Sequence, residues 1–142
     1  MSAGGDKERG RKIFAERADV QCVRCHSIKG EGGNAGPDLA GIGKRQNREY
    51  LLESVLFPAR KIAQGWETVT VRVKGGDTIA GVLKSEDSSQ IVLIDPEKGE
   101  RRIDKSTVTA RRGGQTAMPS DIAQPLSKHD LRDVVEFLAT LK

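Results

Sequence analysis

Cys22-Val23-Arg24-Cys25-His26 is the stretch around which the chain is organised. Cys-x-x-Cys-His is the attachment signature of a c-type haem. The two thiols add to the vinyl groups of the haem as thioethers, and the histidine that follows is held under the iron as the proximal ligand. Two cysteines three residues apart reach two edges of one porphyrin, while the next side chain meets its centre. We therefore expect Cys22, Cys25 and His26 to hold one covalently attached haem c, around which most of the chain folds.

Three other uses of these residues stay open beside haem attachment. A zinc site usually takes four Cys or His ligands, whereas the chain contains two Cys and two His, and the second histidine, His129, lies far along the chain. A thioredoxin-like Cys-x-x-Cys follows a strand in a βαβ unit, and no strand pattern precedes Cys22. A plain disulfide, or a pair of buried free thiols, does not need His26. Haem attachment is the interpretation that uses all three residues.

The composition is compatible with a small protein built on a large cofactor. The chain has 142 residues, of which 4% are aromatic and 31% are charged. This length allows one domain, or a small domain with an insertion, and a haem would supply apolar surface that the aromatic residues do not.

No apolar run reaches the ~18 residues of a membrane span. No secretory signal is recognisable at the start. Because covalent haem is attached outside the cytoplasm in bacteria, we expect a periplasmic or otherwise exported protein, with residues 1–5 as a processed start from which the export signal has been removed.

The charge favours a protein partner over nucleic acid. The formal net charge is +4, a modest excess that suits electrostatic guidance of a partner protein. The basic residues that we expect to supply a docking surface are Arg101, Arg102, Lys105, Arg111 and Arg112.

The first helix is predicted to begin after Asp6, which can cap it, and to run to about Arg17. Gly10, Ile13 and Phe14 fall on one face at helical spacing. The glycine permits a close helix crossing. Phe14 either presses on the haem edge or is an ordinary core residue.

A glycine-rich loop follows the motif, from Lys29 to Leu39. Such a loop can bring its backbone against the imidazole of His26. A metal-bound histidine usually donates its other N–H to a carbonyl or a carboxylate, and the Pro37 carbonyl is the acceptor that we expect. Leu39 would then pack on the haem face.

Two further helices are predicted from their caps and spacing. Asn47 caps a helix from Arg48 to Phe57, and Ser127 with Asp130 resembles a capping box that opens the last helix. The last helix should pack across the first, because each needs a partner for its apolar stripe.

Trp66, the only tryptophan, either donates its indole N–H to a haem propionate or is a half-buried packing residue.

From Glu67 the apolar period changes from helical to two, which is typical of strands. Runs over residues 69–73, 78–84, 90–94, 100–103 and 108–111 are separated by Gly, Asp and Ser clusters. This pattern predicts an antiparallel meander, folded as a small bent sheet or an SH3-like barrel.

The sixth ligand of the iron has three candidates, which are Met118, His129 and Met1. Met118 lies in an irregular stretch stiffened by Pro119. His129 lies at the start of a helix, beside a cap, where it should face water. A thioether also favours ferrous iron. Met118 is therefore the expected second metal ligand beside His26.

Taken together, these features resemble a class I cytochrome c. The matching features are Gly10-x-x-x-Phe14, Cys22 to His26, Gly36-Pro37-Asp38-Leu39, Met118-Pro119 and the closing helix, over residues 6–66 and 113–142. The resemblance implies an α-helical fold around one haem, with His26 and Met118 as axial ligands. The interval from His26 to Met118 is longer than in small class I cytochromes. The β-rich stretch accounts for the excess, and it looks like the inserted sheet in haem-binding domains of some environmental bacteria, such as acidobacterial and planctomycete-type proteins.

The expected architecture is a mainly α cytochrome c domain, 6–66 with 113–142, interrupted by an inserted β subdomain, 67–112, so that the chain is α+β overall. The expected function is a monomeric one-electron carrier, not an enzyme, between a dehydrogenase and an oxidase or another cytochrome. The main alternative is a gas-binding or sensor module, in which Met118 is absent from the iron or displaceable. A peroxidase-like enzyme ranks last, because it would need His129 over an open site.

Overall fold

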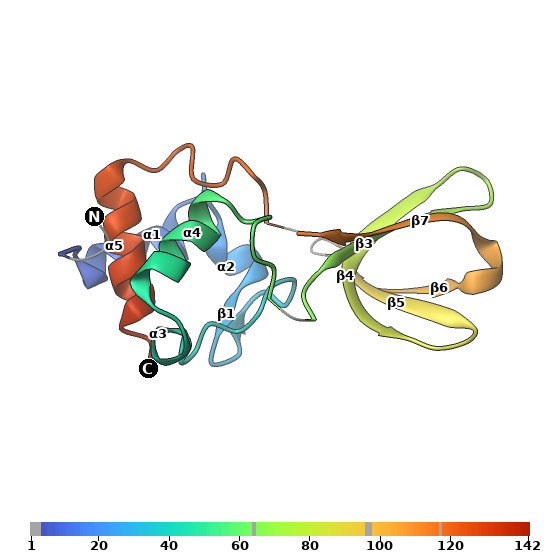
Figure 1. Cartoon of the computed structure of the whole chain (residues 1–142), viewed down its shortest axis with the longest axis horizontal. Coiled ribbons are helices and arrows are strands. Elements are labelled where there is room, and N and C mark those ends of the chain that lie inside the picture. Colours follow the sequence, from blue (N-terminus) through green and yellow to red (C-terminus); the bar gives the residue numbers. More distant parts are fainter. Residues whose placement is uncertain (1–3, 64, 96–97, 117) are drawn as a thin grey trace.

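The computed structural model describes residues 4–63, 65–95, 98–116 and 118–142. Helices and a five-stranded antiparallel sheet lie side by side, joined by two passages of the chain (Figure 1). The combination of helices and antiparallel strands is the α+β class predicted from the sequence. Helix α1 and the C-terminus lie at the helical end, away from the sheet (Figure 1). No helix in the described ranges is long and apolar enough to cross a membrane.

The helical part contains five helices and one small hairpin among its described residues. They are α1 (Lys7–Glu16), α2 (Cys22–Cys25), β1 (Ser27–Ile28), β2 (Glu31–Gly32), α3 (Ile42–Arg45), α4 (Arg48–Leu56) and α5 (Lys128–Ala139). The predicted caps are present at the long helices. Asp6 accepts from two N–H groups of α1, Asn47 accepts from the first turn of α4, and Ser127 forms a capping box with Asp130. Helix α4 ends at Leu56, one residue earlier than predicted.

Helices α1 and α5 cross closely, as predicted, and Gly10 is the reason that they can. A Cβ at Gly10 would overlap the Asp133 carbonyl and lie 2.9 Å from the Cβ of Phe137. Next to this crossing, the rings of Phe14 and Phe137 pack with centroids 5.7 Å apart. The apolar residues of both helices form the centre of the helical core.

A cluster of ion pairs joins the same two helices. Arg9 donates to Asp130 at 2.7 Å and to Asp133 at 2.6 Å, and Arg17 donates to Asp130 at 3.0 Å. Asp130 and Asp133 are each only 6% exposed. Their carboxylates are tolerated there because buried charge is paired and hydrogen-bonded.

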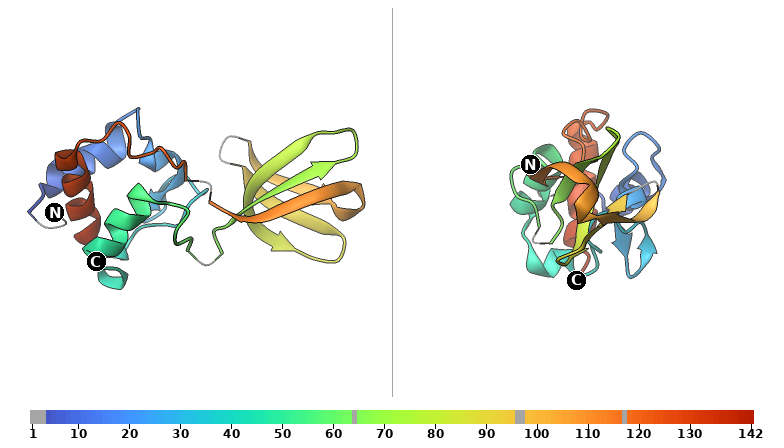
Figure 2. Two further views of the ribbon diagram at one scale, coloured as in Figure 1. Left: turned by 45° about the horizontal axis from the view of Figure 1, so that its top comes forward. Right: turned by 90° about the vertical axis from the view of Figure 1, so that its right-hand side faces the viewer.

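The sheet has the strand order β6-β5-β4-β3-β7. Its elements are β3 (Thr68–Val73), β4 (Thr78–Glu86), β5 (Gln90–Asp95), β6 (Gly99–Asp104), the 3-10 helix η1 (Lys105–Thr107) and β7 (Val108–Gln115). The predicted meander runs from β3 to β6. Strand β7 then returns to pair with β3, and it continues to Gln115, beyond residue 112. Figure 2 shows how strongly the strands bend around an interior.

The interior of the sheet is a second apolar core. It is formed by Val69, Val71, Ile91, Leu93 and Ile103, all at most 4% exposed. The pairs Val71 with Ile79 and Leu93 with Leu83 keep these side chains on one face. The helices and strands that contact one another most extensively belong either to the helical part or to the sheet. The two apolar cores are therefore separate.

Candidate haem-attachment site

Helix α2 is one turn long and consists of the two cysteines and the residues between them. Its backbone bond runs from the His26 N–H to the Cys22 carbonyl at 3.0 Å. Residues at i, i+3 and i+4 share one face of a helical turn. Cys22, Cys25 and His26 are therefore brought together by a single turn, as the motif requires.

Both thiols are free and half-buried. Burial raises the pKa of Cys22, and it raises the pKa of Cys25 against the opposing effect of the Arg24 charge. The thiols therefore stay protonated near neutral pH. No disulfide joins them, so both sulfur atoms are available for thioether bonds.

The imidazole of His26 is oriented by a backbone carbonyl. Its Nδ1 lies 2.9 Å from the Pro37 oxygen, and because a carbonyl only accepts, Nδ1 carries the proton. This is the hydrogen bond predicted from the sequence. Burial lowers the pKa of His26, while the bond to Pro37 raises it. A neutral imidazole with Nε2 unprotonated is the form that binds a metal.

Gly36 lets the loop approach the flat side of this ring. A Cβ at Gly36 would lie 2.7 Å from Cε1 and 2.8 Å from Nδ1 of His26. The Gly36 N–H also donates to the Cys25 carbonyl at 2.8 Å, which fixes the loop on α2. The absence of a side chain at residue 36 is thus required by the position of the imidazole.

The sequence analysis named Asp38 only as part of the Gly36-Pro37-Asp38-Leu39 motif. In the structure, Asp38 holds the loop together through its hydrogen bonds. Its carboxylate accepts hydrogen bonds from the backbone of Gly30, Ala40 and Lys29 and from the Ser27 hydroxyl. These donors, Gly30 first, lower the pKa of Asp38 to about 2. The hairpin β1–β2 that it holds lies in a stretch predicted to be wholly loop, and two-residue strands leave no recognisable period.

These residues fit a covalent haem. Two free sulfur atoms on one helical turn can form the thioethers, and His26 Nε2 is left for iron by the bond to Pro37. The space that a side chain at Gly36 would fill is taken by the imidazole itself.

A comparison with protein families matches residues 7–93 to the family described as Cytochrome c. The chain belongs to the cytochrome c family. Membership implies covalently bound haem c and a role in electron transfer. The matched range includes Cys22, Cys25 and His26 of this cytochrome c, and it ends within β5, so it does not reach Met118. A comparison with curated proteins gave no match.

Met118 lies on the segment that leads from β7 to α5. It is half-buried, and its N–H donates to the Thr116 hydroxyl at 3.2 Å. The residue after it, Pro119, lines a cleft of about 570 Å³ together with Cys25. The chain therefore brings this segment beside the attachment motif, although no contact joins Met118 to His26 among the bonds of the described residues.

The remaining predicted site residues of the cytochrome lie as follows. Phe14 is 3% exposed in the helical core, and Leu39 packs against the same core. Trp66 is half-buried, and its indole N–H has no hydrogen-bond partner within the described ranges. His129 is exposed on the first turn of α5, as expected. Met1 lies outside the described residues.

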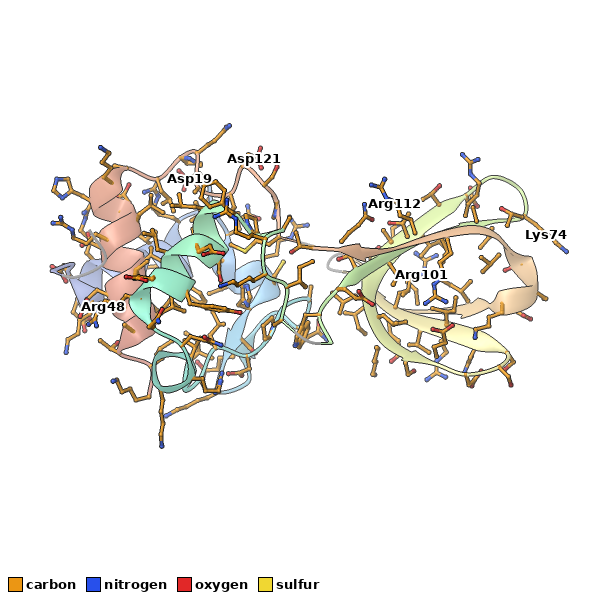
Figure 3. The ribbon with its side chains drawn as sticks, viewed as in Figure 1. Asp19, Arg48, Lys74, Arg101, Arg112 and Asp121 are labelled. Carbon is orange, nitrogen blue, oxygen red and sulfur yellow. The ribbon has the colours of Figure 1, made fainter. Side chains whose placement is uncertain are left out.

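The basic cluster of the sheet does not form one patch. Arg111 and Lys105 both bind Glu86, and Arg102 binds Glu100. Arg101 pairs with Leu93 on the inner face, whereas Arg112 pairs with Thr70 on the other face. Figure 3 shows Arg101 within the outline of the bent sheet and Arg112 outside it. Clustering in sequence misled because neighbouring residues of a strand face opposite ways.

Proposed function

We propose that this cytochrome c is a periplasmic one-electron carrier that holds a single haem c through Cys22 and Cys25, with His26 and Met118 as the axial ligands. When bound, the haem supplies one-electron chemistry at its iron, at a potential that a thioether ligand raises. The protein supplies ligands, burial and a docking surface for redox partner proteins, such as a dehydrogenase and an oxidase or another cytochrome.

The observation that carries this proposal is the hydrogen bond from His26 Nδ1 to the Pro37 oxygen at 2.9 Å. A histidine that binds metal almost always donates its other N–H in this way, which fixes its orientation and raises its basicity as a ligand. Together with the two free thiols of α2, this bond leaves little use for the motif other than haem attachment.

The support for Met118 as the second ligand comes from the course of the chain. Pro119, which follows it, shares the cleft with Cys25, so the segment passes the motif. His129, the other candidate among the described residues, is exposed at the far end of this segment. Met118 is therefore the better candidate.

We also propose the division into a cytochrome domain, 6–66 with 113–142, and an inserted SH3-like subdomain, 67–112. The support is that the helical core and the sheet core have no buried residue in common. Ala80 and Asp95 of the sheet line the same cleft as Cys25. We infer that the insert restricts which partner proteins reach this cleft.

Visible spectroscopy of the haem-loaded protein tests the proposal. We expect the long-wavelength band of methionine-ligated ferric haem, no rapid binding of CO to the reduced form, and loss of that band in Met118→Ala. His129→Ala is the matched control and should leave the spectrum unchanged. Rapid CO binding by the unmodified protein would favour the gas-binding alternative, and a chain without covalent haem would refute both functions.

A further inference from the structure

Asp38 is the carboxylate that accepts the most hydrogen bonds in the loop beside His26. Its Oδ2 accepts from the Ser27 hydroxyl at 2.9 Å and from the Gly30 N–H at 2.8 Å. Its Oδ1 accepts from the N–H groups of Lys29 at 3.1 Å and Ala40 at 2.8 Å. One side chain therefore joins the hairpin that follows His26 to the segment that carries Pro37.

The turn that Asp38 holds is one that the backbone disfavours. Lys29 has a φ of +53° and Gly30 a φ of +82°. A non-glycine residue is disfavoured in the left-handed region because its Cβ comes too close to the following carbonyl oxygen, so the turn needs bonds from elsewhere in the structure. The carboxylate supplies them, since it accepts from both N–H groups at the tip.

Pro37 is fixed on both sides by contacts to the attachment motif and to Ser27, the residue that follows it. Before it, the Gly36 N–H donates to the Cys25 carbonyl at 2.8 Å. After it, Asp38 binds the Ser27 hydroxyl, and the Leu39 N–H donates to the Ser27 carbonyl at 2.8 Å. The Pro37 carbonyl that orients His26 is thus held on its C-terminal side chiefly through Asp38 and the residue next to it.

We propose that Asp38 is a positioning residue for His26, which keeps the Pro37 carbonyl on Nδ1 and so sets the orientation and the donor strength of the imidazole toward the haem iron. The proposal rests on the proposed function, in which His26 is an iron ligand. A weaker bond at Nδ1 makes the imidazole a poorer donor, which stabilises ferric iron less and raises the reduction potential.

The test compares Asp38→Ala and Asp38→Asn with the unmodified, haem-loaded protein. We expect the reduction potential to shift to more positive values, with the larger shift in the Ala variant, because Asn keeps one acceptor oxygen. The N–H groups of Lys29 and Gly30, and the Nδ1 proton of His26, should exchange faster with solvent. The Asn variant preserves the size of the side chain, so its potential decides the matter if the Ala variant does not fold.

Asp87→Ala and Asp87→Asn are the matched controls. Asp87 also closes a turn, since it accepts from the Ser89 N–H and the Gln90 N–H, both at 2.8 Å, but this turn joins β4 to β5, away from His26. These variants should leave the potential unchanged. An unchanged potential in Asp38→Asn, with covalent haem present, would overturn the inference. Failure of the unmodified chain to take up haem would instead overturn the proposed function.

Discussion

The helical part and the sheet are filled in different ways. The interior of the sheet is closed by its own side chains, with Val71 and Leu93 at 0% exposure. In the helical part, α2 and α3 have no buried residue and α4 has only Leu51. These three helices contribute little to the core, which is built mainly by α1 and α5, and covalent haem is what the family of this chain binds.

This difference teaches which part depends on the cofactor. A sheet that buries its own apolar face against itself can hold its structure alone, although small domains of this size are only marginally stable. A helical part that wraps a macrocycle loses packing when the macrocycle is missing. The two parts should therefore respond differently to the same treatment, and the predictions below separate them.

The largest effect is expected when haem attachment is prevented by replacing Cys22 and Cys25 with Ser. When the variant is denatured in acidified solvent, no haem should remain attached to the protein. The amides of α4 should also lose their protection against hydrogen exchange. The amides of β4 and β5 should stay protected, because their core does not involve the motif. Loss of protection in the sheet as well would mean that the two parts fold as one unit.

The reverse experiment removes the centre of the sheet core. Leu93→Ala should lower the free energy of unfolding of the sheet by about 2–5 kcal/mol, as expected for a buried leucine. The visible spectrum of the haem should stay the same. Leu138→Ala, in the helical core, is the counterpart and should destabilise the helical part while the sheet keeps its unfolding midpoint. If either variant lowers both midpoints equally, the separation of the cores is wrong.

The features that could be predicted from the sequence are those carried by local chemistry. Helices α1, α4 and α5 were predicted from their caps and spacing, and the strands from their apolar period. The bond between His26 and Pro37 was predicted because a metal-bound histidine needs an acceptor. Each of these signals is contained in a few neighbouring residues.

The features that could not be predicted depend on residues far apart or on very short elements. Helix α3 has four residues and begins after Gly41, which offers no side-chain cap. The role of Asp38 needs the loop to fold back on the hairpin, and the pairing of Glu86 with Arg111 needs the strand register. The division of the basic cluster between two faces of the sheet could not be predicted either, because the sequence does not show which face each cation occupies.

A smaller effect is expected from filling the space beside His26. Gly36→Ala should push the imidazole away, because the new Cβ would lie 2.7 Å from Cε1. Overpacking of this kind costs about 1–3 kcal/mol, so the helical part should unfold earlier and the spectrum should report an altered proximal ligand. Gly113→Ala in β7 is the control, since its Cβ would meet only Val69 Cγ2 at 3.9 Å. An unperturbed spectrum in Gly36→Ala would show that the loop moves and the ring does not.

The smallest effect is expected for the stability of the sheet at low pH, to which Glu86 contributes. Arg111, followed by Lys105, lowers the pKa of Glu86 from 4.5 to about 2. Because the folded value is the lower one, the stabilisation is complete above pH 4.5 and is lost as the pH falls toward about 2. The unfolding midpoint of the sheet should therefore fall over this interval, less steeply in Glu86→Gln, while the helical midpoint follows the same curve in both proteins. Glu86 is solvent-exposed, so salt should reduce the difference in unfolding midpoint between the unmodified protein and Glu86→Gln. An equally steep fall in Glu86→Gln at low salt would assign the acid sensitivity of the sheet to other carboxylates.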